Sequence, residues 1–193
     1  MIAATLSLPN SVNALNWSPP QNIEIDRSEG WPNILSFVRD CWLDKRGARS
    51  MPSRSDISPA QLKAQLPHIL LADVIDGGMD FLYRLVGTEL RRFFYSVPSG
   101  EPMSKILAPF GEATVEGTLA SYRGVLGRRA PVRITGAGVW FGQEPKLFDA
   151  YLAPLSDDDS AISMILGTFV FEGDREHQFR QPLAPRLGGS GVA

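Results

Sequence analysis

The sequence contains few of the residues from which catalytic and metal sites are built. Its 193 residues include one cysteine, Cys41, and two histidines, His68 and His177. A single cysteine cannot form an internal disulfide. The two histidines lack the short spacing that is typical of metal ligands, and no nucleophile-elbow motif marks a hydrolase. We therefore predict no catalytic residue and no metal site, and we expect that the protein is not an enzyme.

The sequence also lacks a strong charge and a long apolar run. Its net charge is -2, whereas nucleic-acid binding favours basic patches. No apolar run approaches the roughly 20 residues that a transmembrane helix requires, and residues 1–17 lack the basic start and apolar centre of a secretory signal. We therefore expect a cytoplasmic protein that contacts neither nucleic acid nor membrane.

One stretch, Ile69 to Leu90, indicates a β-hairpin that leads directly into a helix. Ile69 to Ile75 and Phe81 to Val86 are apolar runs rich in branched and aromatic residues. Asp76-Gly77-Gly78 lies between them, and glycine readily adopts the positive φ of tight turns. Thr88 can cap the helix that follows. Because Leu85 lies in the second run, we expect its side chain to be buried.

Three short motifs in and before this hairpin are similar to those of the stand-alone PAS-domain proteins of proteobacteria. They are Pro52-Ser53-Arg54, Asp56-Ile57-Ser58-Pro59 and Tyr83-Arg84-Leu85-Val86-Gly87-Thr88. The similarity extends from about Trp31 to Phe171, which is most of the chain. The resemblance implies a bacterial sensor module for signal transduction. It also implies an α+β PAS fold, with five mainly antiparallel strands, helices on one face around a small cavity, and an N-terminal flanking helix.

The remaining patterns agree with that fold. Helical periodicity predicts helices over Trp31–Arg46 and Phe110–Leu126, and alternating or continuous apolar runs predict strands over 130–141, 146–155 and 161–171. Shorter helices are expected over 58–67, 88–95 and 103–107. We therefore divide the chain into an N-terminal arm over residues 1–27, a single PAS domain over residues 28–173, and a flexible C-terminal tail over residues 174–193. We expect no output domain after Phe171, so a protein partner must supply the output in trans.

The N-terminal helix has an apolar stripe at helical spacing, formed by Ile34, Leu35, Val38, Cys41 and Trp42. Such a stripe must pack on its own domain or on another copy. Flanking helices of PAS domains often pair two copies, so the resemblance favours a homodimer. We predict that Val38 and Trp42 lie near the centre of the dimer interface. The alternative is a helix that folds back on its own sheet.

A candidate ligand pocket lies between the expected sheet and the central helices. Its polar or aromatic lining is predicted to be Tyr83, Phe94, Tyr122, Arg133 and Tyr151. A buried tyrosine hydroxyl requires a hydrogen-bond partner, which a small hydrophobic or amphipathic ligand could provide. The alternative is ordinary core packing, which would make the protein a ligand-free interaction adaptor.

The resemblance disfavours two cofactors and leaves the identity of any other unknown. Haem-binding PAS domains of the oxygen-sensing type use a histidine on the long central helix, but residues 110–126 contain none. Flavin-binding PAS domains of the light-sensing type use a cysteine on a helix in mid-domain, whereas Cys41 lies far upstream. Haem and covalent flavin chemistry are therefore not expected.

Two polar segments are expected to be structural. Arg54 and Asp56 lie in a loop, and we predict that they fasten this loop to the domain. Asp157 to Asp159 lack the spaced ligands of a calcium loop, so we interpret them as a turn between two strands.

Overall fold

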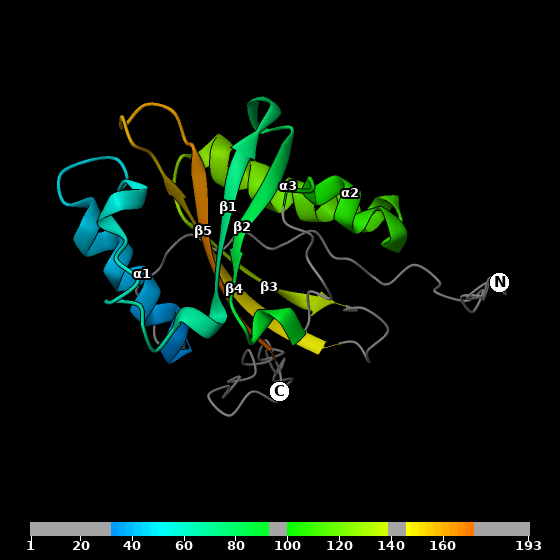
Figure 1. Cartoon of the computed structure of the whole chain (residues 1–193), viewed down its shortest axis with the longest axis horizontal. Coiled ribbons are helices and arrows are strands. Elements are labelled where there is room, and N and C mark those ends of the chain that lie inside the picture. The colour runs from blue at the N-terminus through cyan, green and yellow to red at the C-terminus, as the bar shows by residue number, and fades with distance from the viewer. Residues whose placement is uncertain (1–31, 93–99, 139–145, 172–193) are drawn as a thin grey trace, which may run out of the picture.

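The computed structural model describes residues 32–92, 100–138 and 146–171. Within them, five strands form one sheet in the order β2-β1-β5-β4-β3, and every neighbouring pair is antiparallel (Figure 1). The strands are β1 (Ile69–Ile75), β2 (Asp80–Val86), β3 (Val132–Gly138), β4 (Lys146–Leu155) and β5 (Met164–Phe171). This α+β arrangement confirms the predicted fold class.

The predicted hairpin is formed by β1 and β2. A short 3-10 turn, η3 (Asp76–Gly78), joins them, and all three of its residues have positive φ: 48° at Asp76, 64° at Gly77 and 90° at Gly78. Gly77 and Gly78 adopt positive φ without steric strain, because glycine has no Cβ. Arg84 of β2 forms an ion pair with Asp73 of β1, so the charge that this strand carries is paired across the hairpin.

A β-bulge in the hairpin overturns the expectation that Leu85 is buried. Leu71 pairs with Leu85 but Ala72 pairs with Tyr83, so Arg84 is an extra residue in β2. A bulge reverses the alternation of side chains beyond it. Tyr83 therefore faces the core, Val86 takes the next inward position, and Leu85 is 36% exposed.

Three helical elements cover one face of the sheet: η4 (Leu90–Arg92), α2 (Met103–Leu107) and α3 (Glu112–Arg128). Helix α3 lies across the sheet (Figure 1). Its residues Leu119, Tyr122 and Val125 are buried in the core. The strands contribute the rest of this cluster, which includes Leu70, Phe81, Leu152, Ile165 and Phe169. We call this side of the sheet the α3 face.

Helix α1 (Asn33–Arg46) covers the opposite side, the α1 face (Figure 1). Its buried residues Ile34, Leu35, Val38 and Trp42 pack on strand residues such as Leu71 and Leu166. The Trp42 indole Nε1 donates a 2.9 Å hydrogen bond to the carbonyl oxygen of Pro154. The helix is therefore folded back on its own sheet.

This placement corrects the expectation for Val38 and Trp42. Their side chains are 0% and 1% exposed within a single chain, so neither is available at the surface to form the centre of a dimer interface. Amphipathic periodicity shows that a stripe is buried but not against what. The second of the two arrangements that the sequence left open is the one observed.

The short helices differ most from expectation. Residues 58–67 form two separate turns, with backbone bonds to Ser58 and to Leu62, followed by the 3-10 helix η2 (Leu66–His68). Of the helix predicted over 88–95, Leu90–Arg92 forms the 3-10 helix η4, and residues 93–95 lie outside the described part. The helical turn over Met103–Leu107 is confirmed as α2. Helix α3 continues past Gly127 and ends where Arg129 adopts a left-handed conformation, with φ 51°.

Candidate functional site

The sheet divides the residues of the predicted pocket into two groups. Tyr83 and Tyr122 lie on the α3 face, whereas Arg133 and Tyr151 lie on the α1 face, where they are register partners on β3 and β4. Phe94 lies outside the described residues. The five residues therefore cannot all line one cavity, and of the four that the structure describes, Tyr83 and Tyr122 lie between the sheet and the central helix.

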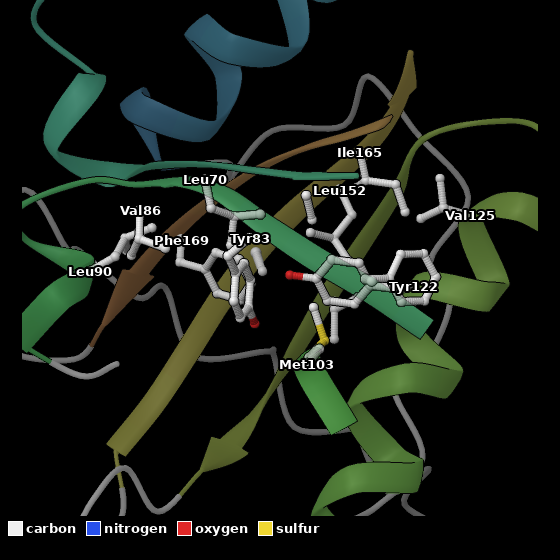
Figure 2. Packing of buried hydrophobic residues seen from close by; sticks show 14 of the residues in the cluster. Leu70, Tyr83, Val86, Leu90, Met103, Tyr122, Val125, Leu152, Ile165 and Phe169 are labelled. Atoms are coloured by element: carbon white, nitrogen blue, oxygen red, sulfur yellow. The ribbon is translucent and has the colours of Figure 1, made fainter. Parts of the chain in front are cut away.

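Tyr83 and Tyr122 bring two hydroxyls into an otherwise apolar layer (Figure 2). Their side chains are 5% and 2% exposed, and the Tyr122 hydroxyl points toward Tyr83 (Figure 2). The Tyr122 ring also contacts Phe81, with 5.0 Å between ring centroids. Burial raises the pKa of both phenols above the ordinary value of 10, because the interior disfavours the phenolate. At neutral pH these groups can form hydrogen bonds but cannot act as bases.

The α1 face carries a buried ion pair. The Arg133 Nε lies 2.9 Å from Asp149 Oδ1, and its Nη2 lies 2.5 Å from Asp149 Oδ2. The Asp149 residue is only 1% exposed. A bidentate guanidinium is the strongest available partner for a buried carboxylate. Arg133 therefore neutralises Asp149. The sequence did not indicate this pair, because Asp149 lies two positions along β4 from Tyr151, which is the register partner of Arg133.

Tyr151 of β4 lies on the α1 face and is fully buried. It belongs to the cluster that helix α1 covers, together with Leu71, Leu166 and Val170. Burial raises the pKa of its hydroxyl, as it does for the two tyrosines on the other face. Its position under α1 makes it part of the helix-binding surface of the sheet.

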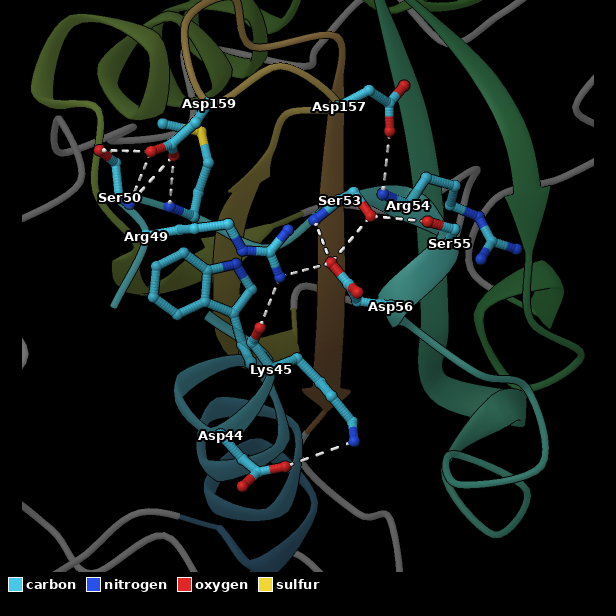
Figure 3. Close-up of polar contacts among 12 residues, drawn as sticks. Asp44, Lys45, Arg49, Ser50, Ser53, Arg54, Ser55, Asp56, Asp157 and Asp159 are labelled. Atoms are coloured by element: carbon cyan, nitrogen blue, oxygen red, sulfur yellow. Dashed lines mark hydrogen bonds and ion pairs between the residues drawn. The ribbon is translucent and has the colours of Figure 1, made fainter. Parts of the chain in front are cut away.

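A network of polar bonds fastens the loop after α1 (Figure 3). Asp56 Oδ2 accepts hydrogen bonds from Ser53 N at 2.7 Å, Ser53 Oγ at 2.8 Å and Arg49 Nη2 at 2.7 Å. The backbone bond from Ser53 and the side-chain bonds from Arg49 and Ser53 lower the pKa of Asp56 from its ordinary 3.8 to about 2. The Arg54 guanidinium donates to the Ile57 carbonyl. The prediction that Arg54 and Asp56 fasten this loop is confirmed.

The acidic turn between β4 and β5 completes the same network. Asp159 accepts bonds from the backbone N–H groups of Ser50 and Met51, and Asp157 accepts a longer one from Arg54 N (Figure 3). Asp158 accepts bonds from residues of its own turn, including Ser160 N at 2.9 Å, which hold its pKa far below the usual range. Among the described residues, no group of three or more His, Cys, Asp or Glu side chains is arranged so that it could hold a metal ion. The three aspartates of this turn accept hydrogen bonds from backbone N–H groups of the loop after α1 and of the turn itself.

An open depression of about 360 Å³ lies at the end of the sheet that the hairpin turn occupies. Its lining is Val74, Gly77, Leu126, Arg129 and Ile162. The guanidinium of Arg129 donates to the Ser160 carbonyl at 2.6 Å, which fixes it at the rim. These residues come from three distant segments, and no motif in the sequence indicates that they meet.

Comparison with known families decides the identity of this architecture. A family model described as the PAS domain matches residues 34–170, a range that contains α2, α3 and four complete strands and ends within the fifth. The chain belongs to the PAS domain family. A search of curated proteins gives no match to it.

Membership of the PAS domain family indicates the general kind of role that such domains have. PAS domains are in general sensory or regulatory domains without enzymatic activity, and they commonly bind small ligands and proteins. In the described part of this PAS domain, no helix has the length and apolar character needed to cross a membrane. Partial burial raises the pKa of the Cys41 thiol, which lowers its thiolate fraction at neutral pH.

Proposed function

We propose that this PAS domain is a non-enzymatic regulatory module that holds a small amphipathic molecule between the sheet and α3. In this proposal Tyr83 and Tyr122 are the groups that recognise the ligand, and a protein partner supplies the output in trans. The observation that carries the proposal is the pair of phenol hydroxyls in an apolar layer. A phenylalanine would fill the same space without the cost of burying a hydroxyl.

The surroundings of the two hydroxyls limit the class of ligand. The buried polar and charged residues of the described chain are Ser53, Asp149, Ser156 and Thr168. Asp149 and Thr168 lie on the α1 face beside Tyr151, and Ser53 and Ser156 lie where the loop after α1 meets the end of β4. A charged ligand on the α3 face would therefore lack a counter-ion and would lose its hydration. We infer a neutral molecule with an apolar body and one or two hydroxyl or carbonyl groups.

The residue that could adapt to such a molecule is Met103. It is fully buried, it packs in the same cluster as the two tyrosines, and it begins the five-residue helix α2. Methionine is unbranched and changes rotamer at low cost, so it can repack around a guest. A ligand that displaced Met103 would also shift α2, and this movement would carry the signal to the surface.

A second function, the ligand-free interaction adaptor, is favoured by a different observation. Phe81 and Tyr122 are in direct ring contact, and both residues are almost fully buried in the described chain. A filled interior of this kind needs no guest to be stable. In that case the surface of the domain would bind its partner without a small-molecule signal.

Native mass spectrometry of the purified full chain, beside a denatured sample, separates the two functions. The ligand proposal predicts an extra non-covalent mass in the wild type. It predicts that Tyr122→Phe reduces the occupied fraction severalfold, and that Tyr151→Phe, the matched change on the other face, leaves it unchanged. The adaptor is favoured if no extra mass is found and no neutral small molecule in a thermal-shift screen raises the melting temperature.

A further inference from the structure

The open depression at one end of the sheet is lined by residues other than the two tyrosines of the α3 face. The hairpin turn, the C-terminal end of α3 and the segment before β5 meet there (Figure 1). Its volume of about 360 Å³ lies within the roughly 300–1,000 Å³ of small-molecule sites. The depression is therefore a candidate site of its own.

Three apolar side chains make up most of the lining: Val74 of β1, Leu126 of α3 and Ile162 before β5. Each of these residues is only partly buried. Val74 and Leu126 also pack against the cluster on the α3 face, and Ile162 packs against the cluster on the α1 face. Contact with the apolar part of a ligand would remove their exposed surface from water, which is favourable.

Arg129 provides a cation at the rim, and both its backbone and its side chain are held in place. Its backbone N–H donates to the Leu126 carbonyl at 3.3 Å, and its Nη2 donates to the Ser160 carbonyl at 2.6 Å. A guanidinium has five N–H donors, so the bond to Ser160 leaves donors for a ligand. Within residues 32–92, 100–138 and 146–171, no carboxylate forms an ion pair with Arg129.

The other charges around the depression also favour an anion. Arg128 is exposed beside Arg129, and Asp76 is exposed beside Gly77 of the lining. The three aspartates of the turn before β5 already accept hydrogen bonds from backbone N–H groups. Two arginine charges against the one charge of Asp76 are then left to interact with a ligand. This balance attracts a carboxylate.

We propose that this depression is a binding site for a small carboxylate with an apolar body. The carboxylate accepts hydrogen bonds from Arg129, and the apolar body covers Val74, Leu126 and Ile162. One guanidinium can donate to both oxygens of a carboxylate, which fixes its orientation. This class of ligand differs from the neutral molecule proposed for the α3 face, so the two proposals can fail separately.

Two-dimensional proton–nitrogen NMR of the full chain, titrated with hexanoate, tests the site. We expect saturable shifts of the backbone amides of Gly77, Arg129 and Ile162, which line the depression. Hexanamide has the same apolar body without the charge, and acetate has the charge without the body. Each should bind about fivefold more weakly than hexanoate or worse, since each lacks one of the two interactions.

The decisive variant is Arg129→Gln, which removes the charge at the rim and should raise the hexanoate dissociation constant about fivefold or more. The matched control is Arg128→Gln, which removes the same charge one residue earlier, outside the lining. It should change the constant by less than about twofold, because solvent screens a charge that does not touch the ligand. Circular dichroism checks that both variants are folded.

Three results would overturn the proposal. The first is the absence of saturable shifts at the three amides, including the case in which hexanoate shifts only Tyr83 and Tyr122 on the α3 face. The second is hexanamide that binds the wild type as tightly as hexanoate, a comparison that needs no variant. The third is an equal effect of the two arginine variants, which would show that net charge alone attracts the probe.

Discussion

At the scale of single residues, Gly87 shows why the Val86-Gly87-Thr88 motif contains a glycine. Strand β2 ends here against the segment before β1, and the Gly87 N–H donates to the Ile69 carbonyl at 2.8 Å. A Cβ built on Gly87 would lie 2.2 Å from the Pro67 carbonyl oxygen and 2.4 Å from that of Leu66. Because these neighbours are backbone atoms, they cannot move aside as a side chain can.

We therefore predict that Gly87→Ala lowers the free energy of unfolding by about 3 kcal/mol or more. The matched control is Gly124→Ala in α3, where an added Cβ meets nothing within 4 Å. That change should raise stability by about 0.5–1 kcal/mol, because alanine favours helix more than glycine does. Urea denaturation measures both, and a Gly87→Ala loss below about 1 kcal/mol would contradict the close approach.

A second residue-scale prediction concerns acid stability. The folded pKa of Asp56 is lowered to about 2 by the Ser53 and Arg49 bonds, whereas in the unfolded chain it should be near 3.9. The carboxylate therefore contributes stability above the unfolded value, and this contribution is lost as pH falls toward 2. Asp56→Asn should lower stability at neutral pH and flatten its decline between about pH 4 and 2.

The control for that experiment is Asp44→Asn on the last turn of α1. Asp44 is an exposed carboxylate that pairs with the adjacent Lys45 at 3.4 Å, and it takes no part in the bonds that fasten the loop. Urea denaturation at several pH values should give it the same acid profile as the wild type. If Asp56→Asn keeps the full decline as well, the Ser53–Asp56 bonds do not contribute to acid stability.

At the scale of elements, helix α1 is the part whose role the structure changes most. Its stripe is part of the protein's own core, on the face opposite α3. Val38 is fully buried, whereas its neighbour Phe37 is 44% exposed. The two residues therefore offer a matched pair for testing how the helix is placed.

We predict that Val38→Asp abolishes cooperative folding, since it buries a carboxylate without a partner. Phe37→Asp should change stability by no more than about 0.5 kcal/mol, as exposed substitutions generally do. Thermal unfolding followed by circular dichroism measures both. A Val38→Asp protein that folds normally would show that α1 is not held on the sheet in solution.

The elements also show what could be read from the sequence and what could not. The hairpin, α3 and the last three strands were predictable because each has an apolar period or a glycine turn of its own. Leu85 was placed wrongly because one bulged residue, Arg84, reverses the alternation. The pocket residues were grouped wrongly because Tyr83 and Tyr151 lie on strands whose faces only the register sets.

At the scale of the whole molecule, the sheet separates two apolar clusters that share its strands. Strands β1 and β5 direct residues into both: Leu70 and Ile165 into the cluster under α3, and Leu71 and Leu166 into the cluster under α1. The backbone bonds that hold one cluster together therefore hold the other. We infer that both faces unfold in one cooperative step, and that neither helix layer is stable without the sheet.

Alkaline unfolding tests this inference, because buried tyrosines report on each face. Tyr83 and Tyr122 lie under α3 and Tyr151 under α1, and burial raises the pKa of all three above 10. A raised pKa contributes stability below the unfolded value, near 10, which is lost as pH rises beyond it. With three such groups, the free energy of unfolding should fall by about 4 kcal/mol per pH unit above pH 10.

Absorbance of tyrosinate during a pH jump should therefore show the three phenols ionising together with the loss of circular dichroism. Tyr122→Phe and Tyr151→Phe should each remove the signal of one of the chain's four tyrosines without dividing the transition, since either face opens only when the sheet does. If the signal that Tyr151→Phe removes instead appears at lower pH than the rest, α1 detaches before the sheet opens. The two clusters would then be separate units of stability, and the placement of α1 could be altered without unfolding the α3 face.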